Sequence, residues 1–180
     1  PKVIVINDGF GAKKENWKEI EAISHKLGVH HIIRQTNEGF KAGNINNAMK
    51  LFKGSNPNKT IFIVFDADFS ALPQFITEIT KPLSDESVDF VQSPQSYKNE
   101  VTWVSKAAAA HQSYFFDYIC PAKAHDNALF LCGTNFAIRQ SALDAVGGMD
   151  TKYITEDYAT SLNLHLARKK GVFIPEVLAY

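Results

Sequence analysis

Two aspartates that directly follow an apolar segment are the residues of this sequence best placed to do chemistry. Residues 60–65 read Thr-Ile-Phe-Ile-Val-Phe, and Asp66-Ala67-Asp68 follow at once. Such an apolar run predicts a buried strand, and ligands of open α/β sheets bind outside the carboxyl ends of the strands. Carboxylates at that position can hold a hard divalent cation and, through it, a phosphate. A strand followed by an acidic turn without any ligand is the simpler alternative.

Two polar segments in the first third of the chain could serve the same ligand. Asn7-Asp8-Gly9 ends a strand-like stretch, and Asp8 could accept hydrogen bonds from a base or a ribose. Residues 38–48 are polar, contain glycine and lead into a helix, whose free N–H groups attract anions, and Lys41 adds a positive charge there. The ordinary structural alternatives are a tight turn and a helix entry with Asn44 as N-cap. Neither segment carries the signature of a dinucleotide-binding fold or a P-loop ATPase.

Two further segments with candidate residues lie in the second half of the chain. Residues 130–139 set small polar residues between apolar pieces, and we expect Cys132 to be a packed thiol because no sequence neighbour would lower its pKa. Thr155 suits an N-cap, which places Glu156 and Asp157 in the first turn of a helix, where the helix dipole stabilises acids. The functional alternative makes Asp157 a general base that removes a proton from a substrate hydroxyl.

Strands and helices alternate along the chain, which predicts an α/β fold with a mainly parallel sheet and helices on both of its faces. The expected strands lie at about 2–6, 30–34, 60–65 and 88–92, and the expected helices at about 14–27, 42–52, 72–83, 100–118 and 156–169. Residues 119–134 are expected to form a loop, and residues 177–180 form another strand-like stretch. The candidate residues therefore fall at strand ends and helix starts.

The bulk composition narrows the class of protein. The chain has 180 residues, of which 45% are hydrophobic, and this length favours one domain. Lys plus Arg and Asp plus Glu both total 19, so the net charge gives no indication of a nucleic-acid partner. Cys120 and Cys132 lack the spacing of a zinc or redox motif and fit a reducing, cytosolic setting. No apolar run reaches the roughly 18 residues that a membrane span needs.

Five short segments of the chain, taken in their order and spacing, are more specific than any one of them alone. They are Asn7-Asp8-Gly9, Lys41-Ala42-Gly43-Asn44, Asp66-Ala67-Asp68, Cys132-Gly133-Thr134 and Thr155-Glu156-Asp157. Taken together, they resemble the processive, cellulose-synthase-like branch of the family 2 glycosyltransferases. The resemblance spans Val3 to Tyr180 and implies a GT-A fold and a hexosyltransferase that works in polysaccharide biosynthesis. It also implies a UDP-sugar donor, a glycan acceptor and inversion at the anomeric carbon.

The resemblance implies a role for each of these segments. On the donor side, Asp8, Lys41 and Asp66 would bind the nucleotide-sugar, and Asp66 and Asp68 would hold its diphosphate through Mg²⁺ or Mn²⁺.

On the acceptor side, the resemblance makes Asp157 the catalytic base. Cys132, Gly133 and Thr134 would form the acceptor-side segment, with Glu156 beside it. The acceptor hydroxyl would then attack the sugar from the face opposite the UDP leaving group.

The sequence departs from the family pattern at one residue and at both ends. Asn7 stands where the family usually has an aspartate. A nucleotide-binding strand is expected before Pro1, and a Gln-x-x-Arg-Trp motif is expected after Tyr180. We therefore interpret residues 1–180 as one truncated catalytic domain that can be inactive alone. The resemblance further implies a parent protein with membrane helices outside this part, which would face the cytosol.

Two alternatives remain at the level of sequence. The strand that ends at Asp66 also resembles the nucleophile loop of haloacid-dehalogenase-type phosphatases, in which that aspartate would be phosphorylated. Phe69-Ser70 after the loop and Lys41 before it do not fit that family. The second alternative is a non-catalytic domain of the same fold that binds a nucleotide, although such a domain has no evident need for the base Asp157.

Overall fold

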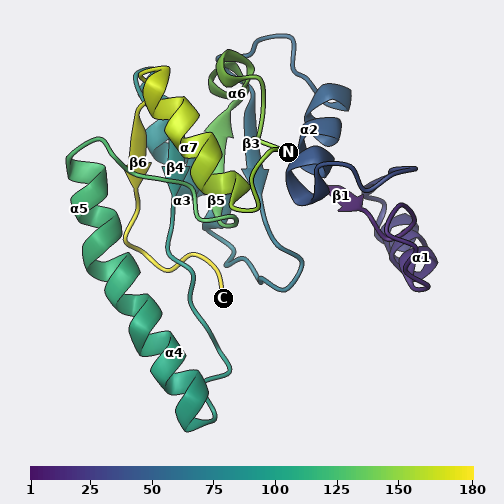
Figure 1. The fold of residues 1–180 in the computed structure, drawn as a ribbon, viewed down its shortest axis with the longest axis horizontal. Coiled ribbons are helices and arrows are strands. Elements are labelled where there is room, and N and C mark those ends of the chain that lie inside the picture. The colour runs from purple at the N-terminus through teal and green to yellow at the C-terminus, as the bar shows by residue number, and fades with distance from the viewer. The chain divides into compact units, whose positions relative to one another are not determined.

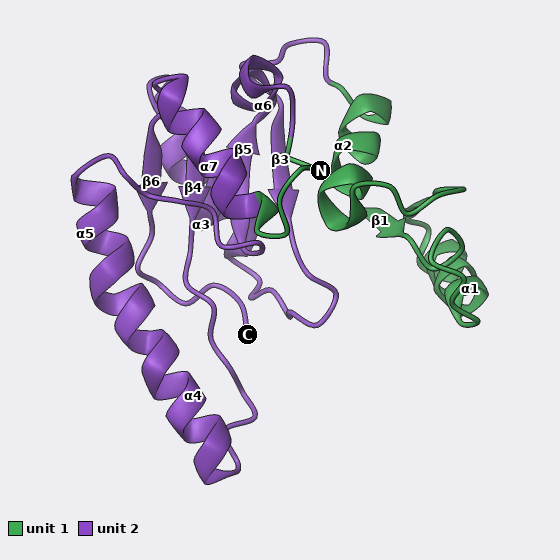
Figure 2. Ribbon diagram, viewed as in Figure 1, with its two compact units in different colours: residues 1–53, 149–156 green, residues 54–148, 157–180 purple.

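The computed structural model describes all 180 residues, and its strands and helices alternate along most of the chain (Figure 1). The chain divides into two compact units, which are coloured separately in Figure 2. Unit 1 comprises residues 1–53 and 149–156, and unit 2 comprises residues 54–148 and 157–180. Each unit has its own sheet and is described by itself.

Unit 1 is built on a parallel pair of strands. β1 (Ile4–Asn7) pairs with β2 (His30–Ile33), and Asn7 is opposite Ile33 at the carboxyl ends of both strands. α1 (Trp17–Leu27) connects them and ends at Gly28, whose positive φ of 66° suits a residue without a Cβ. α2 (Phe40–Leu51) follows β2. The four predicted elements of this unit are confirmed to within a few residues.

Unit 2 contains a four-stranded sheet with the order β3-β5-β4-β6. The strands are β3 (Ile61–Val64), β4 (Phe90–Gln92), β5 (Phe136–Arg139) and β6 (Gly171–Phe173). β4 and β6 are parallel, whereas β5 runs antiparallel to both of its neighbours. We expected a mainly parallel sheet, and this is wrong for β5. The chain enters β5 at Phe136, beside the last residues of β3 and β4, so β5 must run in the opposite direction to both. Neither β5 nor β6 was predicted as a strand.

The side chains of this sheet alternate between two apolar layers. Ile63, Ala137 and Val91 lie side by side in register and belong to a core that includes α3 (Phe75–Thr80). The intervening positions, such as Phe90, project to the opposite face, since successive residues of a strand alternate. There the Phe90 ring lies 6.1 Å from the ring of His165 in α7 (Glu156–Leu166), which crosses the strands in Figure 1. The two faces are thus covered by α3 and α7.

A long helical segment follows β4 in unit 2. α4 (Trp103–Tyr114), a π-helical turn at Phe115–Ile119 and α5 (Cys120–His125) run end to end, as Figure 1 shows. Thr102 and Ser105 form a capping box at the start of the segment. The expected loop at 119–134 is wrong for its first part, because the helical segment continues through Pro121 to His125. No residue of α4 is buried.

The remaining elements complete unit 2. A 3₁₀ turn at Lys81–Ser84 extends α3, and α6 (Gln140–Val146) follows β5 directly. The strand-like stretch at 177–180 forms no strand, and Ala179 makes only an isolated bridge to Ala71. No helix is both long enough and apolar enough to span a membrane.

Candidate donor and acceptor site

Asp66, the first of the paired acids after β3, is held at its backbone by Thr134. Asp66 is half-buried and Asp68 is exposed, two and four residues beyond the end of β3. The backbone N–H of Asp66 donates a hydrogen bond of 2.9 Å to the Thr134 hydroxyl. The structure therefore brings two of the predicted segments, Asp66-Ala67-Asp68 and Cys132-Gly133-Thr134, directly together.

The segment before β5 has a strongly bent backbone. Gly133 has a φ of 80° and Asn135 a φ of 56°. These left-handed conformations suit glycine and are tolerated by asparagine. Thr134 and Asn135 are almost completely buried, at 2% and 0% exposure. Because β5 begins beside the ends of β3 and β4, with Phe136 opposite both Val64 and Gln92, this bend lies at their carboxyl ends.

Two glutamines, one at the end of β4 and one just after it, bind the peptide groups of Cys132. Gln92 is fully buried, and its Oε1 accepts a 2.8 Å hydrogen bond from the Cys132 N–H. Its Nε2 donates to the carbonyl of Thr134 at 2.9 Å. Gln95 Nε2 donates to the Cys132 carbonyl at 2.6 Å. The sequence analysis missed both glutamines, although an amide directly after the apolar pair Phe90-Val91 is a signal of a polar strand end.

The thiol of Cys132 is kept protonated. A hydrogen bond to the Cys120 thiol, burial and the nearby Asp157 carboxylate together raise the pKa of Cys132 well above its usual range. A protonated thiol is a poor nucleophile. This agrees with a packing role for Cys132, and it also places the Asp157 carboxylate near the acceptor-side segment.

Asp157 is half-buried in the first turn of α7, and its backbone ties that turn to the acceptor-side segment. The Asp157 carbonyl accepts a 2.7 Å hydrogen bond from Ser161 Oγ, which in turn accepts a 2.8 Å bond from the N–H of Leu131. One carboxylate oxygen of Asp157 accepts a 2.7 Å bond from the N–H of Tyr158. Ser161 is a further positioning residue that the sequence analysis missed.

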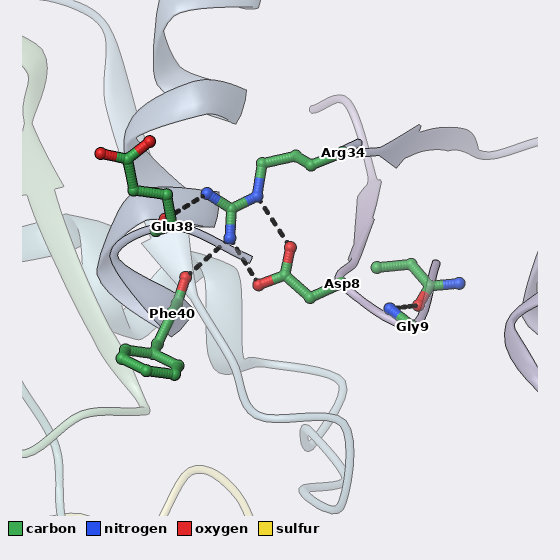
Figure 3. A network of polar contacts seen from close by, with 6 residues as sticks. Asp8, Gly9, Arg34, Glu38 and Phe40 are labelled. Atoms are coloured by element: carbon green, nitrogen blue, oxygen red, sulfur yellow. Dashed lines mark hydrogen bonds and ion pairs between the residues drawn. The ribbon is translucent and has the colours of Figure 1, made fainter. Parts of the chain in front are cut away.

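In unit 1, Asp8 is held by the arginine that follows the neighbouring strand, β2. Arg34 Nε and Nη2 donate to the two Asp8 carboxylate oxygens at 2.7 and 2.6 Å (Figure 3). The same guanidinium donates to the carbonyls of Glu38 and Phe40 at 2.8 and 3.0 Å. Because Asp8 follows β1 and Arg34 follows β2, the pair joins the carboxyl ends of two parallel strands. The sequence analysis missed Arg34, although a basic residue at that edge was visible in the sequence.

Asn7 uses both ends of its amide in the turn that precedes Asp8. Its Oδ1 accepts from the Gly9 N–H at 2.8 Å, and its Nδ2 donates to the Trp17 carbonyl at 3.1 Å. A carboxylate has no proton to donate to that carbonyl. Asn7 therefore makes both hydrogen bonds of this turn, and an aspartate at this position could make only the one to the Gly9 N–H.

α2 begins earlier than predicted. Its N-cap is Gly39, with a φ of 68°, so the expectation that Asn44 caps the helix is wrong. Asn44 lies inside the helix, where it is 4% exposed. Lys41 is half-buried in the first turn. The positive end of the helix dipole and Lys41 therefore lie at the same helix start.

The candidate residues are distributed over both units. Unit 1 holds Asp8, Lys41 and Glu156, whereas unit 2 holds Asp66, Asp68, Cys132, Gly133, Thr134 and Asp157. Within unit 2 the contacts described above link Asp66 to Thr134 and place Cys132 near Asp157.

Comparison with known proteins decides the family. Residues 61–180 match the model described as "Glycosyl transferase family group 2". The chain belongs to this family. The matched region contains the whole cluster of Asp66, Asp68, the 132–134 segment and Asp157.

Curated relatives of this family 2 chain include bacterial cellulose synthases. It is 26% identical over 183 residues to Cellulose synthase 2 of Novacetimonas hansenii. The aligned region covers 98% of the chain and 11% of the relative. It is 28% identical over 172 residues to the UDP-forming cellulose synthase catalytic subunit of Pseudomonas fluorescens, covering 91% of the chain and 22% of the relative. The chain thus spans about a tenth to a fifth of the length of these relatives.

Solved glycosyltransferases show the same fold. A mannosyltransferase from Pyrobaculum calidifontis, solved with GDP-Man and Mn²⁺, matches 99% of the chain and 46% of its own chain at 18% identity and a TM-score of 0.65. A glucosyl-3-phosphoglycerate synthase from Mycobacterium tuberculosis, solved with Mn²⁺, UDP and phosphoglyceric acid, matches 99% of the chain and 59% of its own at 16% identity and a TM-score of 0.57. The predicted GT-A fold is confirmed.

The acids of this family 2 domain suit a metal that the substrate also ligates. The structure contains no group of three or more His, Cys, Asp or Glu side chains that could hold a metal ion by themselves. Asp66 and Asp68 offer hard carboxylate oxygens, and Mg²⁺ is typically bound by one or two carboxylates together with substrate phosphates. The donor set therefore fits a cation shared with a diphosphate.

Proposed function

We propose that the protein is an inverting glycosyltransferase that moves a sugar from a UDP-sugar to a hydroxyl of a growing β-glycan or another glycoside acceptor. The observation that carries this proposal is the hydrogen bond between the Asp66 N–H and Thr134. It joins the acids suited to a diphosphate to the 132–134 segment, and the hydrogen bonds from Leu131 N–H to Ser161 and from Ser161 to the Asp157 carbonyl connect that segment to the first turn of α7. The residues that we propose to bind the donor and to accept the proton are thus both connected to residues 132–134.

The proposed donor site uses carboxylates and one lysine. Asp66 and Asp68 would hold Mg²⁺ or Mn²⁺, and the ion would stabilise the negative charge that develops on the UDP leaving group. Asp8 would accept hydrogen bonds from the nucleotide, with its orientation fixed by Arg34. Lys41, at the start of α2, would add a positive charge for the diphosphate.

The proposed acceptor site centres on Asp157. Its carboxylate would accept the proton of the acceptor hydroxyl as that oxygen attacks the sugar. The bent Cys132-Gly133-Thr134 backbone and Glu156 would hold the acceptor beside this base. The neutral thiol of Cys132 contributes shape rather than a covalent step, so inversion in a single displacement needs no sugar–enzyme intermediate.

Calorimetric titration of UDP, with and without Mn²⁺, tests the donor half of the proposal. We expect binding that depends on Mn²⁺ and is lost in Asp68→Ala. Asp126→Ala, which removes an exposed aspartate after α5, is the matched control and should bind UDP as the unchanged chain does. Binding without any dependence on the metal or on Asp68 would contradict the proposed donor site.

Turnover separates an enzyme from a nucleotide-binding domain of the same fold. In the full-length protein, Asp157→Asn should retain UDP binding and lose transfer of sugar, because the amide cannot accept the proton. A full-length protein that binds UDP but transfers no sugar even with Asp157 intact would favour the non-catalytic alternative. The phosphatase alternative predicts instead that Asp66 is a nucleophile, which binding of beryllium fluoride, a phosphoryl mimic, to Asp66 would reveal.

A further inference from the structure

A polar hollow lies between the loop after β4 and the exposed helix α4, within unit 2. It has a volume of about 230 Å³ and is lined in part by Gln95, Tyr97 and Gln112. This is below the ~300–1,000 Å³ typical of sites for drug-sized ligands. We call it the Tyr97 hollow, and we propose that it binds one sugar residue of the acceptor glycan. The inference rests on the proposed function, because it assigns a further subsite to the same acceptor.

A directional chain of hydrogen bonds connects the hollow to the acceptor-side segment. The Tyr97 hydroxyl donates to Gln112 Oε1, and Gln112 Nε2 donates to Gln95 Oε1 at 3.0 Å. Gln95 Nε2 then donates to the Cys132 carbonyl at 2.6 Å. Aligned hydrogen bonds of this kind polarise and strengthen one another. A ligand that binds at Tyr97 or Gln112 therefore acts on the groups that hold Cys132.

The unused hydrogen-bonding capacity in the chain matches hydroxyl groups. Each glutamine amide has two N–H donors and two acceptor lone pairs, and the chain of hydrogen bonds uses one donor and one lone pair on Gln112 and on Gln95. Each amide thus has a donor and an acceptor left. A sugar hydroxyl also donates and accepts, so it can satisfy such a pair of groups.

The charges and the aromatic ring at the hollow favour a neutral sugar over an anion. Glu100 and Lys106 line it with opposite charges, so it offers no net positive field for a phosphate. Tyr97 lines the hollow and is 39% exposed, so part of the residue is accessible to a ligand. An aromatic side chain with a polar tip can pack against the apolar face of a sugar while its hydroxyl remains hydrogen-bonded.

The loop wall of the hollow is anchored on both sides of Tyr97. Asn135 Nδ2 donates to the Pro94 carbonyl at 3.3 Å, and the Lys98 ammonium lies 4.8 Å from the centroid of the Tyr180 ring. The opposite wall is α4, which begins with a capping box. A site held in this way loses less conformational entropy when a ligand binds.

Two-dimensional NMR of the ¹⁵N-labelled chain, titrated with cellotetraose, tests the inference. We expect shifts in the amide signals of residues 95–97 and 112, and a linked shift at Cys132. Gln112→Ala should weaken the binding about tenfold, the effect of losing roughly 1.4 kcal/mol of hydrogen bonding, and should abolish the shift at Cys132. Tyr118→Phe is the control, because this tyrosine is 65% exposed on the same helical segment and does not line the hollow.

Several results would overturn the inference. The first is that cellotetraose shifts no signals. The second is that Gln112→Ala, shown by circular dichroism to be folded, binds cellotetraose with unchanged affinity. The third is that inorganic phosphate shifts the same signals. A parallel titration with UDP and Mn²⁺ keeps this inference separate from the proposed function. If UDP binds and cellotetraose does not, the hollow is not a glycan subsite and the donor site stands. If cellotetraose binds through Gln112 and UDP does not bind, the hollow is a glycan-binding site and the proposed donor site fails.

Discussion

The Thr134 hydroxyl accepts a 2.9 Å hydrogen bond from the backbone N–H of Asp66, across a sequence separation of 68 residues. Thr134 is 2% exposed, so water cannot easily replace this bond. The contact fixes where the chain turns after β3, and hence where the Asp66 and Asp68 carboxylates lie. Mutations at Thr134 should therefore affect metal-dependent binding although its own side chain carries no charge.

We expect Thr134→Val to destabilise the protein by about 1–3 kcal/mol, because it leaves the Asp66 N–H without its partner while keeping the side-chain shape. UDP should also bind more weakly in the presence of Mn²⁺. Urea unfolding and calorimetry measure the two effects. Thr134→Ser, which keeps the hydroxyl, should retain most of both properties. Equal behaviour of the valine and serine variants would show that the hydrogen bond does not position Asp66.

The Arg34–Asp8 pair should contribute more to stability than an ordinary surface ion pair. Its side chains are only 12% and 21% exposed, and Arg34 also binds two backbone carbonyls. Arg34→Gln should lower the free energy of unfolding by about 1.5–3 kcal/mol, because hydrogen bonds to a charged group are lost. It should also weaken UDP binding, since Asp8 is no longer held. Denaturant titration and calorimetry give the two values.

The chain offers a matched control for the arginine variant. Lys81 and Glu78 form an exposed ion pair with an N–O distance of 3.8 Å. Lys81→Gln should change the stability by less than about 0.5 kcal/mol. If the two variants destabilise the protein equally, the buried geometry of Arg34 has no special role.

The sequence predicted the parts of the site that depend on local patterns. The apolar run before Asp66 specified a buried strand with acids at its end, and the acids at 156–157 specified the start of α7. Long-range partners were not predictable in this way. Three features depend on which segments meet in three dimensions. They are the antiparallel direction of β5, the hydrogen bonds of Gln92 and Gln95 to Cys132, and the Arg34–Asp8 ion pair.

Substitution of the buried Gln92 should lower the free energy of unfolding, because its amide is hydrogen-bonded to two backbone groups. Its amide accepts from the Cys132 N–H and donates to the Thr134 carbonyl. Gln92→Met preserves the length of the side chain but leaves these backbone groups unpaired, which should cost about 1–3 kcal/mol. Urea unfolding measures the loss. Gln74→Met, at an exposed position before α3, should have little effect. A small loss at Gln92 would mean that the bent segment holds its shape without this amide.

The raised pKa of Cys132 predicts how stability changes with pH. The folded protein keeps this thiol protonated at pH values where the unfolded chain, with a thiol pKa of about 8.5, loses its proton. The stabilisation of the folded state by the protonated Cys132 thiol is therefore fully present below about pH 8.5. Above that pH the free energy of unfolding should fall, by up to about 1.4 kcal/mol per pH unit for this one group.

Cys132→Ser tests this pH dependence because it removes the titrating thiol at nearly unchanged size. Urea unfolding between about pH 7.5 and 9.5, under reducing conditions, should show a steeper loss of stability in the unchanged chain than in the variant. Taking the difference between the two curves cancels the titration of the lysines, and repeating both curves in a Cys120→Ala background removes the titration of the neighbouring thiol. Parallel curves would mean that Cys132 loses its proton equally readily in the folded and unfolded states. The hydrogen bond to Cys120 and the nearby Asp157 carboxylate would then have no net effect on the thiol.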